Sequence, residues 1–180
     1  EVFVATEGVF VKFDPIRIAS KFSNPKIRNK VLDVLLTFGI PFNRWLGMKI
    51  VELTSQVSRV QSKPVRLREN HVGTAHACAL ALLGEYTAGL LIANNYSFAD
   101  YRIIIGSLSV EYHKKGRGFL LGEANAPEVW PKPGMVSEEN EAADFWIEMT
   151  TEITNEKREL VAICRTKWQI KAWKSIVAHS

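Results

Sequence analysis

The sequence predicts an α+β domain in which a curved antiparallel β-sheet wraps around one long central helix, behind an N-terminal helical extension. The main observation is the almost wholly apolar stretch at residues 73–95. Strand-like segments flank this stretch on both sides in sequence. A helix that is apolar on all sides lies either at the centre of a core or across a membrane. One helix buried by one curved sheet satisfies the pattern economically. We therefore expect a helical extension at 1–42 and a single domain at 43–180.

Composition places the chain among ordinary globular proteins. Of its 180 residues, 47% are apolar and 23% are charged, which supplies ample material for a core. The net charge of +4 comes from Lys and Arg residues spread along the chain. A nucleic-acid-binding protein would need them clustered in a stripe, so we expect no nucleic-acid partner. A mildly basic surface does suit a small molecule that carries phosphates.

The two cysteines, Cys78 and Cys164, lie among apolar residues and belong to no metal-binding spacing. We expect both to be buried, reduced thiols of a cytoplasmic protein rather than a disulfide. The chain begins at Glu1 without a Met, so a removed targeting or anchor segment stays open as an alternative. The four histidines form no zinc pattern, and we expect no metal site: His71, His76, His113 and His179.

The extension is expected to be helical from Phe10 to Gly39. Asp14-Pro15 and Asn24-Pro25 each read as an N-cap followed by Pro at the first helical position. In the second helix one stripe is apolar, which predicts packing against the main domain or, alternatively, against a membrane surface or partner. That stripe consists of Ile27, Val31, Leu35 and Phe38.

Strands are expected over residues 46–65, 101–112, 119–126, 142–154 and 160–173. In the fourth segment, apolar residues from Phe145 to Ile153 alternate with polar ones, as in a strand with one buried face. Turn-like residues separate the segments at 113–118 and 155–158, and a proline-rich loop does so at 127–134. Short connections of this kind favour antiparallel pairing.

Glu85 interrupts the apolar stretch near its middle. At a bilayer centre it would cost about 2.5–3.5 kcal/mol, which favours a buried helix over a transmembrane span. Burial raises the pKa of a carboxyl and makes it a useful general base or nucleophile. The alternatives are a Glu paired with Lys or Arg, and a Glu that reaches solvent at an interface.

The residues that open the central helix carry a resemblance to a known family. Asn70, Gly73, His76 and Glu85 match the pattern Asn-x-x-Gly-x-x-His with an acidic residue nine positions after the His. The sequence thus resembles the hotdog thioesterase superfamily, especially its phenylacetyl-CoA-thioesterase-like branch, loosely over residues 46–173. Ala77-Cys78 stands where that branch has Gly-Gly, and the helical acid is Glu rather than Asp.

The start of the central helix is the expected oxyanion site. Unpaired N–H groups and the positive end of the helix dipole suit a developing thioester oxyanion, and the Ala77 N–H would be the main donor. Asn70 would hold the carbonyl or the attacking water, or else serve as a cap or turn residue. Gly73 would permit the turn and His76 would shape the helix start more than it catalyses, and both would contact the bound substrate.

Two further groups complete the expected site. The basic turn with Lys114, Lys115 and Arg117 would contact coenzyme A phosphates, or else be an ordinary solvated hairpin turn. The resemblance implies a water-positioning hydroxyl on the following strand, either Ser107 or Ser109.

Spacing along the helix predicts a homodimer or a dimer of dimers. Ala77 and Glu85 are eight residues apart, which is about 12 Å of α-helix. Glu85 also lies on nearly the opposite helical face from His76. One chain therefore cannot bring both groups to one atom, whereas a two-fold dimer pairs each helix start with the other chain's Glu85. The family resemblance implies the same arrangement.

The leading expectation is hydrolysis of acyl-CoA thioesters at such a shared site, with coenzyme A as part of the substrate and no separate cofactor. One alternative is a hotdog dehydratase or hydratase that uses His71 and Glu85, fourteen residues apart. Another is a non-catalytic acyl-binding or scaffold protein, since Ala77 replaces the family's Gly. Fold alone does not choose among them.

Overall fold

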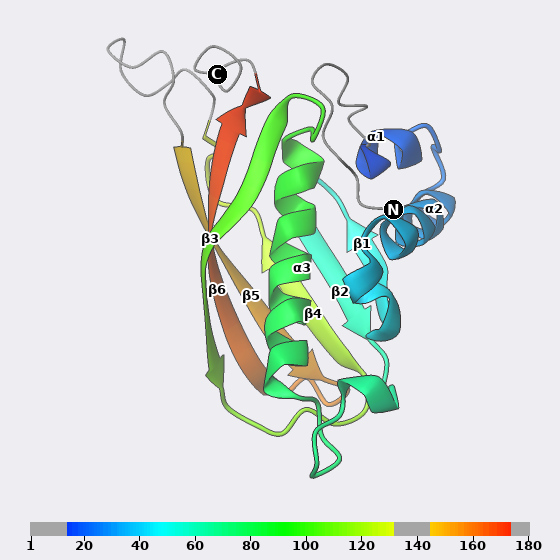
Figure 1. Ribbon diagram of the computed structural model, residues 1–180, viewed down its shortest axis with the longest axis vertical. Coiled ribbons are helices and arrows are strands. Elements are labelled where there is room, and N and C mark those ends of the chain that lie inside the picture. The colour runs from blue at the N-terminus through cyan, green and yellow to red at the C-terminus, as the bar shows by residue number, and fades with distance from the viewer. Residues whose placement is uncertain (1–13, 132–144, 174–180) are drawn as a thin grey trace, which may run out of the picture.

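A computed structural model describes residues 14–131 and 145–173. Six antiparallel strands form one sheet in the order β1-β2-β4-β5-β6-β3, and it curves around the helix α3, Ala77–Asn95 (Figure 1). The predicted α+β architecture is confirmed. The other elements are α1 Pro15–Ala19, α2 Pro25–Gly39, η1 Pro41–Trp45, β1 Met48–Leu53, β2 Val57–Ser62, η2 Arg66–Arg68, β3 Tyr101–Tyr112, β4 Leu120–Asn125, β5 Phe145–Asn155 and β6 Leu160–Ala172.

The strands bury one face, as the sequence pattern predicts. In β5 every second residue from Phe145 to Ile153 is buried, while the residues between them are exposed. Leu83, Ala88 and Leu91 of α3 are buried against this concave face. Because each strand contributes alternate residues to the same face, one side of the helix packs against apolar side chains from most of the sheet.

Helix and sheet approach most closely at Gly84. A Cβ built on Gly84 would lie 2.3 Å from the Cβ of Cys164 on β6, so no larger residue fits without movement. The Thr151 hydroxyl on β5 donates to the Gly84 carbonyl at 3.0 Å. The Gly84 backbone is therefore in direct contact with the centre of the sheet, which fixes the depth of α3.

The extension packs on β1 through a face of α2 that the sequence did not predict. The predicted stripe is wrong in part: Val31 packs against the core, but Ile27 and Phe38 are exposed, and the buried positions are Asn29, Leu32 and Leu36. The physical reason is the edge of the sheet that α2 covers. β1 is an edge strand, and its outward backbone groups need polar partners as well as apolar cover.

Side chains of α2 supply those partners. Asp33 accepts a hydrogen bond from the Ile50 N–H at 2.8 Å. The Asn29 amide donates to the Val51 carbonyl at 3.2 Å, and Arg28 donates to the Leu53 carbonyl at 2.7 Å. The helix thus presents a mixed polar and apolar face to β1. Leu32 and Leu36 also join the core cluster that contains Ile50 and Leu80, so the extension shares the core; the division at 42/43 stays a prediction.

Several boundaries and burial states differ from the sequence-based expectation. The central helix begins at Ala77, after a loop that holds residues 70–76. Cys164 is buried as expected, but Cys78 is exposed because it lies on the open side of the first turn of α3. Predicted features at residues 10–13, 132–134, 142–144 and His179 lie outside the described residues.

Within the described residues, α3 is the helix long and apolar enough to cross a membrane by length and composition. Half of its apolar stretch is buried inside the protein. Contact with all six strands of the sheet and the buried side chains of Leu83, Ala88 and Leu91 identify it as the core helix of this domain.

The contact between α2 and β1 predicts a pH-dependent stability. Burial raises the pKa of the Asp33 carboxyl from 3.8 to about 6, despite the Ile50 hydrogen bond and the charge of Lys49. The folded-state pKa exceeds the unfolded value. The contribution of protonated Asp33 to the stability of the fold is therefore complete below about pH 4 and is lost as the pH rises through about 6.

We expect Asp33→Asn, which is neutral throughout, to gain stability relative to the wild type between pH 4 and pH 7. Allowing for solvent screening, the gain should be about 1 kcal/mol. Urea unfolding at several pH values measures it. A difference between the two proteins that does not change with pH would contradict the assignment.

Candidate functional site

The loop before α3 is built on the side chain of Asn70. Its Oδ1 accepts hydrogen bonds from the N–H groups of Val72 and Thr74, both at 3.1 Å. Its Nδ2 donates to the Thr74 hydroxyl at 2.9 Å. Gly73 has φ +69°, a left-handed conformation that favours glycine, which confirms its predicted role in the turn. Both amide atoms of Asn70 are thus engaged in shaping this loop.

His76 is the N-cap of α3. Its backbone is extended, and its Nδ1 accepts a hydrogen bond from the Cys78 N–H at 3.1 Å. The prediction that His76 shapes the helix start is confirmed. Next to it, the exposed Ala77 N–H makes no hydrogen bond within residues 14–131 and 145–173, while the Ala77 carbonyl accepts one from the Tyr112 hydroxyl at 3.2 Å. This leaves an available donor at the positive end of the helix dipole.

The basic turn lies beside this helix start. The Ala75 N–H donates to the Gly116 carbonyl at 2.8 Å, which joins the turn to the loop. Lys115 and Arg117 are exposed and form no ion pair within the described part of the chain. Lys114 pairs with Glu159 at 2.7 Å. Two uncompensated cations therefore stand at the end of α3 where Ala77 lies.

Glu85 lies on a stripe of α3 that is only partly covered. Cys78, Leu82, Glu85 and Gly89 follow one another at helical spacing along this stripe, so α3 is not enclosed on all sides as predicted. Burial raises the pKa of the Glu85 carboxyl above its ordinary value. Glu85 has no hydrogen bond or ion pair within the described residues, so the paired-carboxylate interpretation does not hold there.

Cys164 on β6 is close enough to Glu85 for the charge of the carboxylate to affect the pKa of its thiol. Burial, with a smaller contribution from the charge of Glu85, raises the pKa of the Cys164 thiol to about 11. The thiol is therefore neutral near physiological pH and serves as packing. Glu85 remains the titratable group on this stripe with the environment of a general base.

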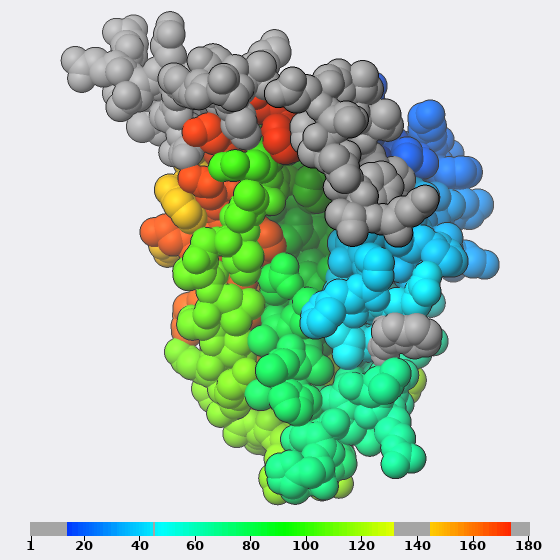
Figure 2. All heavy atoms as spheres, in the orientation of Figure 1, coloured from blue at the N-terminus to red at the C-terminus, as the bar shows by residue number. Residues whose placement is uncertain are grey.

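An apolar cavity of about 430 Å³ opens beside Glu85. Glu85 and Gly89 of α3 line it together with Ile103 of β3 and Trp168 of β6. In Figure 2 the surface is hollowed beside β3, over the C-terminal half of α3. The motif did not reveal the residues of this cavity beyond Glu85, because they come from segments far apart in sequence and carry no chemical signal except apolarity.

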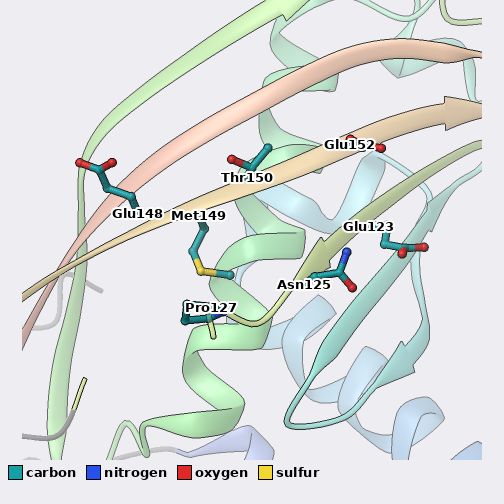
Figure 3. Close-up of a pocket in the computed structure, with 7 residues that line it drawn as sticks. All are labelled: Glu123, Asn125, Pro127, Glu148, Met149, Thr150 and Glu152. Atoms are coloured by element: carbon teal, nitrogen blue, oxygen red, sulfur yellow. The ribbon is translucent and has the colours of Figure 1, made fainter. Parts of the chain in front are cut away.

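Two other hollows lack these features. One of about 310 Å³ lies on the outer face of the sheet, where Glu123, Glu148 and Glu152 surround it (Figure 3). Glu123 pairs there with Arg59 and Glu148 with Lys167, and none of the predicted site residues lines this hollow. The other, about 680 Å³ between α2 and β1, holds Asp33 and lysines but none of the predicted site residues. In the described residues no group of His, Cys, Asp and Glu could hold a metal ion.

Ser107 and Ser109 are not brought to the Glu85 stripe of their own chain. They pair with Lys167 and Arg165 of β6, which are exposed on the outer face of the sheet. Residues directly opposite in an antiparallel pair share a face, so both hydroxyls point away from α3. His71 is exposed on the loop before α3.

Ala77 and Glu85 remain separated in the structure. Both belong to the uninterrupted helix α3, eight residues apart, which corresponds to about 12 Å along its axis. The structure thus supplies two half-sites per chain, an N–H donor with nearby cations at the helix start and a carboxylate with an apolar cavity farther along.

Comparison with known proteins gives a family and a fold. The model of a protein family described as a domain of unknown function, DUF4442, matches residues 28–170. No curated protein matches the chain.

Solved structures resemble the chain over most of its length. One is a Pseudomonas aeruginosa protein named as of unknown function and a "Probable Thioesterase" (22% identity, 77% of this chain and 91% of that chain, TM-score 0.67). Others are thioesterases from Haemophilus influenzae (12% identity, 79% and 89%, TM-score 0.65) and Staphylococcus aureus (15% identity, 73% and 98%, TM-score 0.59). These likenesses show that the chain has the hotdog fold.

The cap at the start of α3 yields a prediction about stability. His76→Ala should lower the free energy of unfolding by about 1 kcal/mol, since the Cys78 N–H loses its acceptor. His76→Asn should restore most of the loss, because Asn is a favoured N-cap. Chemical denaturation measures both, and equal stability of the wild type and the Ala variant would refute the capping role.

Proposed function

This chain belongs to the DUF4442 family, and on that premise we propose that it hydrolyses acyl-CoA thioesters at a site shared between two subunits. One observation carries the proposal: Glu85 is a half-buried carboxylate on the central helix, has no polar partner in the part of the chain that the structure describes, and lines an apolar cavity. A carboxylate in such surroundings is a poor structural element and a good proton acceptor.

The proposed reaction uses one group from each half-site. Glu85 takes a proton from a water molecule as the water oxygen bonds to the thioester carbonyl carbon. The resulting oxyanion receives a hydrogen bond from the N–H of the partner's Ala77, at the positive end of a helix. The intermediate then expels the thiolate as the carbon–sulfur bond breaks. Protonated Glu85 returns its proton to that thiolate, which leaves a free carboxylic acid and coenzyme A.

Pairing along the edge of β3 would bring the two half-sites together. β3 is twelve residues long and pairs on one side with β6; its other edge has no strand within the described residues. Leu108 and Tyr112 on this strand are exposed. A long apolar edge of this kind is a template for another strand. A second copy aligned by a two-fold axis would use the same edge.

The charges at the helix start suit the other end of the substrate. Lys115 and Arg117 are exposed beside the loop that leads into α3. Coenzyme A phosphates would be attracted there. The phosphates would then lie near the oxyanion donor and the acyl group near Glu85.

We expect Glu85→Gln to lower kcat for acyl-CoA hydrolysis by about 10²–10⁴-fold, because Gln cannot accept the proton. Size and packing are nearly unchanged, so thermal unfolding and molecular mass should match the wild type. Free-thiol release measures the rate. Glu148→Gln, on the exposed outer face, is the matched control and should keep full activity.

Ionisation of Glu85 should also determine how kcat depends on pH. The reaction needs ionised Glu85, whose pKa lies above the ordinary 4.5. Wild-type kcat should therefore fall as the pH drops through a value above 4.5, and the remaining rate of Glu85→Gln should lack that step. A folded Gln variant with near-wild-type turnover would remove Glu85 from the mechanism.

The shared site predicts a dimer in solution. Light scattering at micromolar concentration should give at least twice the 20.3 kDa of one chain. Leu108→Lys on the free edge of β3 should shift the protein toward monomer and lower hydrolysis with it. Val51→Lys on β1, at the opposite edge of the sheet, should leave the mass unchanged. A wild type found solely at 20.3 kDa would exclude the shared site.

A further inference from the structure

The cavity beside Glu85 is elongated along α3. Leu82, Glu85, Gly89 and Ala93 all line it, and Leu82 and Ala93 are eleven residues apart. That separation corresponds to about 16 Å of helix. The cavity therefore extends from about one turn before the candidate general base along the helix toward its C-terminal end.

The extension forms one wall of this cavity. The lining residues from the extension lie opposite Ile103 and Trp168 of the sheet. They are Ile16 of α1, Leu36 of α2, Ile40 just before η1 and Phe42 within η1. Figure 1 shows α1 and α2 beside α3, on the side away from β3. A sheet and central helix alone would leave this side of the groove open.

The lining indicates the chemistry of an occupant. Among the described residues that line it, the polar side chains apart from Glu85 are those of Asn43 and Tyr86, and none is Lys or Arg. Such a surface offers nothing to phosphates and favours the removal of apolar groups from water. Length and apolarity together match an alkyl chain better than a short acyl group or a single aryl ring.

We propose that the extension closes an acyl-chain site, and that Phe42 and Ile40 make the protein selective for medium- and long-chain fatty acyl groups. The thioester carbonyl would lie at Glu85, with the chain between α3 and the extension and its end toward Ala93. The selectivity for a substrate rests on the proposed hydrolase function, whereas the alkyl-binding site itself does not.

Phe42→Ala tests the wall directly. Phe42 is 75% exposed without an occupant, so the variant should fold normally. We expect kcat/KM for hexadecanoyl-CoA to fall about tenfold, equivalent to leaving about two methylenes in water, and that for butanoyl-CoA to stay unchanged. Phe38→Ala is the matched control: Phe38 is 68% exposed on the same extension but does not line the cavity. Its chain-length profile should equal the wild type's.

Ile40→Trp tests the same wall in the opposite direction. A larger side chain should fill part of the cavity and so lower kcat/KM for hexadecanoyl-CoA more than for butanoyl-CoA. Equal effects of Phe42→Ala and Ile40→Trp on short and long substrates would overturn the proposal, as would a wild type that prefers butanoyl- or phenylacetyl-CoA.

Binding separates this inference from hydrolysis. S-butyl-, S-octyl- and S-hexadecyl-coenzyme A are thioethers that cannot be hydrolysed, and calorimetry measures their affinity. Affinity should rise with chain length in the wild type and in Glu85→Gln, and the rise should be weaker in Phe42→Ala. If affinity rises with chain length in this way but no acyl-CoA releases its thiol, the hydrolase function is rejected and the acyl-chain site is supported. Thiol release with chain-length-independent binding would reject the acyl site and keep the hydrolase.

Discussion

The structure depends on the burial of one apolar helix in the concave face of one sheet. Gly84 lets the backbone of α3 meet Cys164, and the Thr151 hydroxyl binds the Gly84 carbonyl at the closest point. This contact determines how deep the helix lies and which of its sides the strands cover. The side left half-covered carries Glu85 and faces the cavity. The candidate chemistry is thus a consequence of how far a six-stranded sheet reaches around a helix.

The Glu85 carboxylate, which has no polar partner within the described residues, affects the stability of the fold. Desolvation raises the pKa of Glu85, so the ionised form destabilises the fold at neutral pH. Asp33, by contrast, accepts a hydrogen bond from the backbone of β1, which offsets part of the same penalty. Proteins retain uncompensated groups of the first kind mainly where function requires them.

The sequence alone predicts the fold because its strongest signals are local. The apolar stretch that contains Leu83 and Leu91 predicts the central helix, and the alternation in β5 predicts a one-sided strand. It also predicts that His76 shapes the helix start. The buried face of α2 could not be predicted because its side chains form hydrogen bonds with backbone groups of β1. The exposure of Cys78 could not be predicted because local apolarity does not show how much of the helix the sheet covers. The cavity walls are assembled only by tertiary structure.

The two edge strands differ in how their outward backbone groups are covered. This difference bears on how copies of the chain could associate. Side chains of Arg28, Asn29 and Asp33 occupy outward backbone groups of β1. The outer edge of β3 meets no strand in the described part of the chain. A sheet with both edges bare can polymerise into an endless ribbon. Because side chains of α2 cover the β1 edge, the proposed association through β3 would end after a single partner. The helical extension that borders the cavity would then also limit the assembly to a dimer.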